Sequence, residues 1–489
     1  MARPSRSQFT ERLQQLTDRL RSDMAENILK PGDYLPSEVE LGQTFQLSKE
    51  SVRKALDTLV SEGYIVKVRR VGNRVVGVPA AVRGAEREQT PAGASAAAAG
   101  DGSMPAASRK EPAEVTAAAS VVLRLAYYAP LEDEAKLSSM VASFEQENPG
   151  LRVHLMPTPF PHDYAEHGMA DVFTVSAWDA LKLKERDPEL AIIGKAPDTE
   201  AAHPLLRAAF EDAEGNSKAA PFLFSPIVLC YNREHFRTNG LEEPCGDWTW
   251  YTLLKTARIL ARRSDIWGFA AHIQSLNRWL VFLLQNGFRF SADEGKRTSE
   301  DPALWESLRI ARDLIHQQGR PQPLWAESDS DIERWFVEGK VSMIMTTYFG
   351  LNRLIGTELD YGVAPLPSLR TSDTLLLVTG LAVSSGARQP AEAQKLVRFL
   401  CGERSQLQIR RRTLSLPAHP AALALHAGLE GNRPGREEES GSMWSRCKLY
   451  GDLRLGVGVL EAIREELKSY WSRLEDEVEA SERLDSLLR

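Results

Sequence analysis

The chain has 489 residues, of which 43% are hydrophobic and 26% charged, and its formal net charge at pH 7 is −7. This length suits two or three domains of an ordinary soluble protein. No apolar run reaches the ~18 residues of a membrane span, and no apolar signal segment follows the basic N-terminus, so we expect neither a membrane contact nor export. The four cysteines are scattered without metal-ligand spacing, which favours reduced thiols and no metal site.

Near the N-terminus, turn and capping residues divide the sequence into three helical segments. Pro31 and Gly32 interrupt the first helix, and Ser37 can cap the second, with Glu40 completing a capping box. Ser48 can cap a third helix, which the order of the elements makes the candidate for reading DNA.

Two short strands follow the third helix. Gly63 ends that helix, and residues 64–68 and 74–78 alternate in polarity around a basic, glycine-containing tip. Three helices and such a hairpin predict a winged helix-turn-helix, an α+β fold that binds double-stranded DNA, over residues 1–79. The charge agrees, because residues 1–79 carry 13 Lys and Arg against 10 Asp and Glu, a balance of +3, and the rest of the chain carries −10.

The motifs Pro-Ser-Glu-Val-Glu and Ser-Lys-Glu-Ser-Val-Arg make residues 7–79 similar to the DNA-binding domain of GntR-type bacterial regulators. The resemblance implies that the start of the third helix faces DNA and that a wing shaped by Gly72 and Asn73 enters the minor groove. The sequence departs from the family at Val39, where a basic residue is common. The DNA-binding residues that we expect are Ser37, Ser48, Lys49, Ser51, Arg53, Lys54, Arg69, Arg70, Gly72, Asn73 and Arg74.

Residues 80–119 consist mostly of Ala, Gly, Ser, Pro and Glu and show no bulky apolar periodicity. Such a segment cannot bury enough apolar surface to order itself, so the sequence predicts a flexible linker. A linker of this kind would not transmit a rigid rotation between the domains that it joins.

From Val121 onward, strand-like and helix-like segments alternate with short connections. This pattern predicts an α/β domain over residues 120–489. The expected strands are 121–127, 151–156, 227–231 and 341–345, and the expected helices are 131–147, 250–262, 276–286, 303–317 and 390–401.

Seven short motifs follow in order along this region. They begin at Phe144 (Phe-Glu-Gln-Glu-Asn-Pro-Gly), Ala170 (Ala-Asp-Val), Cys230 (Cys-Tyr-Asn-Arg-Glu), Gly240 (Gly-Leu-Glu-Glu-Pro), Phe336 (Phe-Val-Glu-Gly-Lys), Tyr361 (Tyr-Gly-Val-Ala-Pro) and Gly380 (Gly-Leu-Ala-Val). Together they make residues 121–489 similar to the extracellular solute-binding proteins that feed sugar transporters. The resemblance implies a two-lobed, periplasmic-binding-protein-like domain of type II with the ligand in the cleft, so the whole chain is expected to be a multidomain protein.

The amphipathic tail at 457–488 corresponds to the C-terminal helices of that family. Its apolar residues recur at helical spacing and could either form a dimer surface or close a lobe, and we favour the closing of a lobe. These residues are Leu460, Ile463, Leu467, Tyr470, Trp471, Leu474 and Val478.

Sugars present apolar faces and a rim of hydroxyls, so their sites need flat aromatic rings and a few fixed polar groups. Both kinds of side chain stand at the ends of the expected elements, where open α/β sheets place their ligand crevice. Core packing remains the alternative for each aromatic ring, and Arg278 could simply pair with a carboxylate. The ligand-binding residues that we expect are Tyr127, Tyr128, Trp178, Asp179, Asn277, Arg278, Trp279, Tyr348, Phe349 and Asn352.

The sequence contains no zinc-protease spacing, no nucleophile elbow, no Walker loop and no dinucleotide glycine triad placed after a strand, so we expect no enzyme and no cofactor. The function we expect is a cytoplasmic, homodimeric transcription regulator that binds operator DNA and senses a mono- or oligosaccharide. Two alternatives remain. The large domain could be a pyridoxal-phosphate enzyme of the aminotransferase type, for which Lys218 follows a suggestive serine, or it could have lost its ligand and serve only dimerisation or contact with a transporter.

Overall fold

The computed structural model describes residues 6–26, 28–45, 47, 49–68, 72–76, 121–194, 196, 201–262, 266–290, 301–316, 326–425 and 442–487. The chain divides into two compact units, with the boundary between Ala117 and Ala118. The expected linker at 80–119 lies outside the described residues. Within the described part of the chain, no helix is long and apolar enough to cross a membrane.

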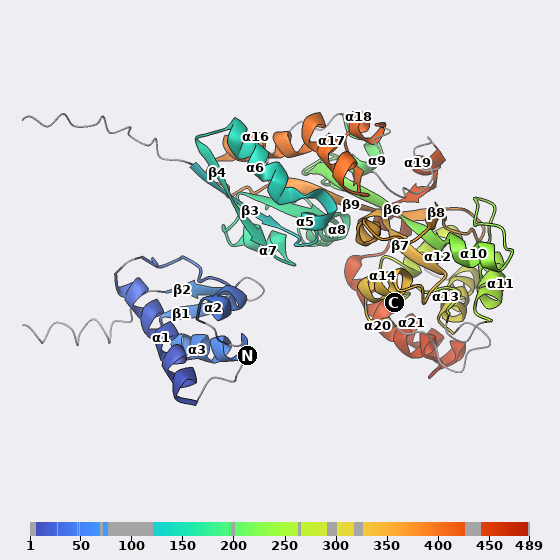
Figure 1. Ribbon diagram of the computed structural model, residues 1–489, viewed down its shortest axis with the longest axis horizontal. Helices are drawn as coiled ribbons and strands as arrows, with labels where there is room; N and C mark the ends of the chain where they lie inside the picture. Colours follow the sequence, from blue (N-terminus) through green and yellow to red (C-terminus); the bar gives the residue numbers. More distant parts are fainter. Residues whose placement is uncertain are drawn as a thin grey trace, which may run out of the picture. The chain divides into compact units, whose positions relative to one another are not determined.

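Over its described residues, the N-terminal unit shows three helices and an antiparallel hairpin (Figure 1). The elements are α1 (Arg6–Ala25), α2 (Glu38–Phe45), α3 (Lys49–Ser61), β1 (Ile65–Val68) and β2 (Gly72–Val75). The expected capping box at the start of α2 is present, because Ser37 N–H donates to Glu40 Oε2 at 2.8 Å and Glu40 N–H donates to Ser37 Oγ at 3.2 Å. The apolar faces of the helices enclose one core, formed by Leu16, Leu20, Met24, Leu35, Leu41, Leu47, Val52, Ala55, Leu56, Leu59, Tyr64, Ile65 and Val75.

A third extended segment, which the sequence did not suggest, lies along β2. Gly32 N–H donates to Val75 O at 2.9 Å, and Leu35 N–H donates to Asn73 O at 2.9 Å. Gly32 has φ of +96°, a conformation that glycine adopts without strain. The chain between α1 and α2 therefore supports the hairpin, so that β2 is paired on both sides.

The second unit has two lobes. Lobe 1 is built on the sheet β10-β6-β9-β5-β3-β4, in which β3 runs parallel to β4 and β5 while β9 runs antiparallel to β5 and β6. Helices α6 and α16 lie side by side on this sheet (Figure 1), where Phe144 and Phe399 meet edge-to-face at 5.3 Å. The elements are β3 (Val121–Tyr127), α5 (Leu131–Ala135), α6 (Leu137–Glu147), β4 (Leu151–Pro157), α7 (Pro161–Glu166), β5 (Val172–Ser176), α8 (Ala177–Arg186), α9 (Pro204–Ala208), β6 (Ala220–Asn232), β9 (Thr374–Val383), α16 (Pro390–Cys401), α17 (Glu403–Arg412), β10 (Leu416–Pro417) and α18 (Pro420–Leu423).

Lobe 2 is built on β7 and β8, which flank the second half of β6. The chain's tail completes it, because Trp471 packs edge-to-face on Trp279 at 5.7 Å and Tyr470 on Trp305 at 5.6 Å. The elements are α10 (Arg233–Thr238), α11 (Trp250–Leu260), α12 (Trp279–Gln285), α13 (Pro302–Ile315), α14 (Asp329–Val337), β7 (Met343–Thr347), α15 (Tyr348–Leu351), η2 (Asn352–Leu354), β8 (Tyr361–Pro365), α19 (Ser442–Arg446), β11 (Cys447–Lys448), η4 (Tyr450–Leu453), α20 (Val457–Trp471) and α21 (Glu477–Leu487).

Strand β6 belongs to both lobes. Residues 220–226 pair with β9, and residues 227–232 pair with β7 and β8. The change of partners occurs at Pro226, whose missing N–H makes it a poor residue for the middle of a sheet. The two lobes are therefore joined by continuous strand, which lets them change their mutual angle through local twist.

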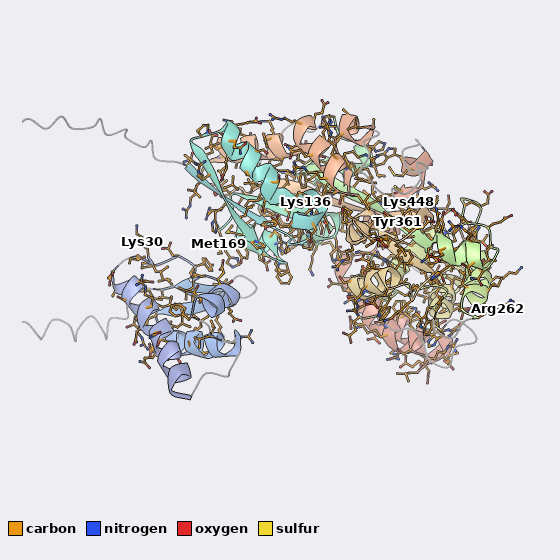
Figure 2. The ribbon with its side chains drawn as sticks, viewed as in Figure 1. Lys30, Lys136, Met169, Arg262, Tyr361 and Lys448 are labelled. Carbon is orange, nitrogen blue, oxygen red and sulfur yellow. The ribbon has the colours of Figure 1, made fainter. Side chains whose placement is uncertain are left out.

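Three expectations about elements need correction. The helix expected over 131–147 is two helices, because Lys136 between them adopts φ of +56° (Figure 2). The strand expected over 227–231 begins seven residues earlier, at Ala220. In the tail, the first five apolar residues are buried in lobe 2, whereas Leu474 and Val478 are exposed, by 79% and 66%.

Candidate functional site

The N-terminal unit presents Arg53 on the exposed side of α3. Its guanidinium forms a bidentate contact with Glu38 at the start of α2, in which Nε lies 3.2 Å from Oε1 and Nη2 lies 2.9 Å from Oε2. Half of the Arg53 side chain remains exposed. The Glu38 contact holds the side chain of the expected reading helix in a defined orientation.

The structure locates the other expected DNA-binding residues only in part. Ser37 is used in the capping box, Arg74 is exposed on β2, and Gly72 begins β2 with φ of +140°. The Asn73 side chain is buried on the inner face of β2, so we remove it from the residues that contact DNA. Ser48, Arg69 and Arg70 lie outside the described residues, as do the side chains of Lys49, Ser51 and Lys54 on α3.

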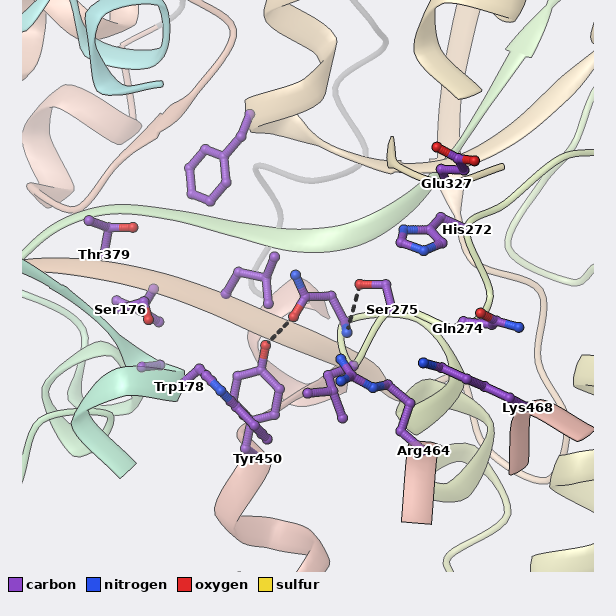
Figure 3. A pocket seen from close by; sticks show the side chains of 16 residues that line it. Ser176, Trp178, His272, Gln274, Ser275, Glu327, Thr379, Tyr450, Arg464 and Lys468 are labelled. Atoms are coloured by element: carbon purple, nitrogen blue, oxygen red, sulfur yellow. Dashed lines mark hydrogen bonds between the residues drawn. The ribbon is translucent and has the colours of Figure 1, made fainter. Parts of the chain in front are cut away.

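In the second unit, a cavity of about 610 Å³ is lined by residues of both lobes, including strand β9. Lobe 1 contributes residues 176–178, β9 contributes residues 377–379, and lobe 2 contributes the loop 272–277 with Phe349. The remaining lining residues are Glu327, Tyr450, Arg464 and Lys468 (Figure 3). The cavity thus combines three aromatic side chains with a rim of polar and charged groups.

Trp178 enters the cavity from the first turn of α8, which hydrogen bonds hold in place. Ser176 caps the helix by accepting from Asp179 N–H at 3.0 Å. Asp179 Oδ2 in turn accepts from Ser176 Oγ at 2.7 Å and from the Tyr128 hydroxyl at 2.5 Å. Burial, and then the Asp179 charge, raise the pKa of Tyr128, so its hydroxyl stays a donor at neutral pH. Asp179 and Tyr128 therefore position Trp178 and do not themselves line the cavity.

Tyr450 links the Trp178 side of the cavity to the loop of lobe 2. Its ring meets Trp178 edge-to-face at 5.0 Å, and its hydroxyl donates to Asn277 Oδ1 at 2.5 Å. Burial raises the pKa of Tyr450, which keeps the hydroxyl protonated. The Tyr450 hydroxyl uses one of the two lone pairs of the Asn277 amide oxygen and fixes the orientation of an amide that also carries two N–H donors.

Besides Tyr128 and Asp179, five more of the expected ligand-binding residues do not line the cavity. The Tyr127 hydroxyl donates to Glu132 at 2.8 Å within the core of lobe 1. Arg278 and Trp279 are each 1% exposed, and Arg278 pairs with Asp329 at 3.0 Å, which was the alternative for it.

The other two expected residues that do not line the cavity, Tyr348 and Asn352, lie close to Phe349 in the sequence, in α15 and η2. Tyr348 is 6% exposed and packs in the core. The Asn352 side chain donates to Ser415 Oγ at 2.8 Å and accepts from Leu414 N–H at 2.8 Å, so its polar atoms tie lobe 2 to the chain before β10. Of the expected set, the cavity therefore receives Trp178, Asn277 and Phe349.

Sequence reasoning missed the contribution of α20. Arg464 and Lys468 are one helical turn apart, so both face the cavity from the polar side of a helix whose apolar side is buried. Their spacing was visible in the sequence, but nothing there shows which polar side chains of an amphipathic helix face a ligand.

Helix α20 also contacts lobe 1 directly. Glu185 of α8 accepts from the backbone N–H of Val457, in the first turn of α20, at 2.6 Å. Lys182 of α8 pairs with Glu461 at 3.3 Å. A carboxylate at a helix N-terminus is favoured by the unpaired N–H groups and by the helix dipole. These contacts form a second connection between the lobes, apart from the shared strand.

Comparison with known families identifies both units. Residues 128–407 match the bacterial extracellular solute-binding proteins, more than half of the chain. The chain belongs to this family. Residues 12–75 match the bacterial regulatory proteins of the gntR family, so the solute-binding domain carries a GntR-type DNA-binding head. This combination is that of a transcriptional regulator, and both resemblances drawn from the sequence are confirmed.

Individual relatives cover each unit in turn. A putative binding protein of Brucella abortus (strain 2308) is 23% identical over 195 residues, which are 38% of this chain and 47% of the relative. An uncharacterized HTH-type transcriptional regulator of Escherichia coli K12, YieP, is 41% identical over 61 residues, which are 12% of this chain and 26% of the relative. The chain thus spans about half the length, or less, of these curated relatives.

A solved structure shares the fold of the solute-binding domain. The ABC substrate-binding protein Lmo0181 from Listeria monocytogenes, determined in complex with cycloalternan, aligns with a TM-score of 0.64 at 18% identity. The alignment covers 76% of this chain and 98% of that protein. The aminotransferase-type alternative is therefore wrong. Lys218 is part of the solute-binding fold, where it pairs with Asp212 at 3.2 Å just before β6.

Proposed function

We propose that this regulator senses a saccharide in the cytoplasm through the cavity of its solute-binding domain and that occupancy of the cavity changes operator binding. The observation that carries the proposal is the meeting of Trp178 from lobe 1 and Phe349 from lobe 2 in one cavity with polar side chains at its rim. Aromatic faces stack on the apolar faces of sugar rings, and the polar rim suits hydroxyl groups.

The volume and the fold agree with a small ligand. A cavity of about 610 Å³ falls within the usual range of ligand pockets, and a protein with the same fold was solved with the saccharide cycloalternan. Because the ligand would contact both lobes, it would bind the closed arrangement more tightly than the open one. This difference in affinity supplies the two states that a regulator requires.

The DNA-binding head supports the cytoplasm as the proposed compartment. Because a bacterial operator lies there, the solute-binding domain on the same chain would sample the saccharides of the cytoplasm. We further propose that the protein binds as a homodimer to two half-sites about one helical turn apart, ~34–36 Å, as is common for winged readers. Genes of saccharide transport and catabolism are the targets that suit such a sensor.

The test combines ligand binding and DNA binding. Calorimetry of the full-length protein with a panel of mono- and oligosaccharides should find a member that binds, and that member should change the affinity for an operator selected from random duplexes. Trp178→Ala should remove saccharide binding, and Trp335→Ala, which alters another partly buried tryptophan away from the cavity, should retain it.

A domain that only dimerises or contacts a transporter would behave differently. It would bind no saccharide of the panel, and both variants would match the unaltered protein in DNA affinity. That result would refute the sensing function and leave the DNA-binding function intact.

A further inference from the structure

The wall of the cavity formed by α20 and the neighbouring loop is rich in hydrogen-bond donors. Figure 3 shows Arg464 and Lys468 pointing from α20 into the cavity, toward the loop that carries Ser275. On that loop, Asn277 also lines the cavity, and its amide, oriented by the bond from Tyr450, carries two further N–H donors. A ligand group that accepts several hydrogen bonds at once suits this wall.

On the cavity side of α20, Arg464 and Lys468 share one carboxylate. Arg464 donates to Glu465 at 2.8 Å, and Lys468 donates to the other carboxylate oxygen at 2.5 Å. These two contacts, that of Lys468 first, lower the pKa of Glu465, which therefore carries a full negative charge. Two cations thus share one carboxylate, and that carboxylate is half-exposed. Arg464 and Lys468 together therefore carry one positive charge more than their shared partner Glu465 neutralises.

The other charged groups near the cavity are Glu327, which lines it, and the buried Arg278 behind it. Glu327 is the carboxylate among the lining residues, and it stands beside His272 (Figure 3). Burial lowers the pKa of His272, and the charges of Arg278 and Arg464 add to the shift against the opposing effect of Asp329, so the ring is neutral at pH 7. Arg278 is fully buried and pairs with Asp329, whose side chain is one-third exposed. The cations that line the cavity therefore come from α20, whereas Glu327 beside His272 contributes a carboxylate.

We propose that the cavity selects an anionic saccharide, whose phosphate or carboxylate group is held by Arg464 and Lys468 while its ring lies against Trp178 and Phe349. The inference rests on the proposed saccharide site and names the class of its ligand. Arginine and lysine form short, charge-assisted hydrogen bonds to phosphate and carboxylate oxygens, and arginine can engage two of them at once. A ligand anion would supply the charge that Glu465 alone does not.

The experiment compares saccharides that differ by one charged group. Calorimetry with the full-length protein would use glucose, glucose 6-phosphate and glucuronate, and also maltose and its aldonic acid, maltobionate. We expect the anionic member of a set to bind at least about tenfold more tightly than the neutral member, the effect of one charge-assisted hydrogen bond. This advantage should shrink as the salt concentration rises. The phosphate and carboxylate members distinguish the two sources of the anion.

Variants of α20 test whether Arg464 and Lys468 cause the tighter binding of the anionic saccharide. Arg464→Gln and Lys468→Gln should each remove most of the anionic advantage, because each should weaken binding of the anionic member by more than it weakens binding of the neutral member. Arg473→Gln removes one positive charge just beyond α20, from a residue that does not line the cavity, and should keep the advantage.

Three outcomes would overturn the inference while leaving the proposed function intact. These are equal or tighter binding of the neutral saccharide, an equal loss of anionic advantage in Arg473→Gln, and an equal loss of neutral binding in the α20 variants. Absence of binding by every saccharide, charged or neutral, would instead refute the proposed function itself.

Discussion

The contact between Arg53 and Glu38 predicts how the DNA-binding head reads a base. Glu38 engages the Nε and Nη2 atoms on one edge of the guanidinium. An arginine held in this way can present its end to the O6 and N7 acceptors of guanine in the major groove. We therefore expect Glu38 to orient Arg53, and we expect the loss of either residue to weaken sequence-specific binding.

Arg53→Ala and Glu38→Gln should weaken operator binding by different amounts. Arg53→Ala removes a base contact and should weaken operator binding by about 1–3 kcal/mol, or roughly 5- to 150-fold. Glu38→Gln removes only the orienting charge. Because the pair is half-exposed on the arginine side, this change should cost about 0.2–1 kcal/mol, at most about fivefold.

Fluorescence anisotropy would measure both variants on the selected operator and on a scrambled duplex, at two salt concentrations. A reduced salt slope together with equal loss on the scrambled duplex would mean that Arg53 contacts only phosphate. Tighter binding of Glu38→Gln to both duplexes would refute the orienting role, because Glu38 would then merely compete with DNA for the guanidinium.

Three further predictions concern the solute-binding domain. Trp178→Ala should abolish the response to saccharide and leave operator affinity without ligand unchanged, and loss of both in the anisotropy assay would mark a structural residue. Tyr450→Phe removes the donor to Asn277 and should weaken saccharide binding by about 1–3 kcal/mol in calorimetry, whereas unchanged affinity would show that the amide needs no orientation. Burial and then the Asp329 charge raise the pKa of Glu333 from 4.5 to about 7, so its stabilising effect is complete below about pH 4.5 and is lost as the pH rises to about 7. Glu333→Gln should flatten this fall, by up to about 1.4 kcal/mol per pH unit, in urea unfolding at pH 5–8, and an unchanged slope would assign the proton elsewhere.

The sequence predicted the elements well where local signals decide them. The capping box of Ser37 and Glu40 formed as expected, and the helix over 390–401 has the expected bounds. Strand β6 was predicted too short because Pro221 and Pro226 argue against a central strand. The structure accommodates Pro221 at a shift of register and Pro226 where the strand changes partners.

The site was harder to predict, because packing against residues far away in the sequence decides whether a side chain points into the cavity or into the core. Trp279 opens its helix as expected, but Trp471, from the far end of the chain, covers it. Asp179 follows Trp178 in the sequence, which suggested a residue that binds sugar hydroxyls, but its carboxylate accepts hydrogen bonds from Tyr128 and Ser176. Nothing in the sequence pointed to Tyr450, because its role depends on a hydrogen bond to Asn277, which lies far from it in the sequence.

The contact of Glu185 with the first turn of α20 gives this helix two tasks. Helix α20 lines the cavity with Arg464 and Lys468, and its first turn contacts lobe 1 through the hydrogen bond from Val457 N–H to Glu185. A ligand that displaced the middle of α20 would also displace its first turn and would therefore change the contact between Val457 and Glu185 on α8.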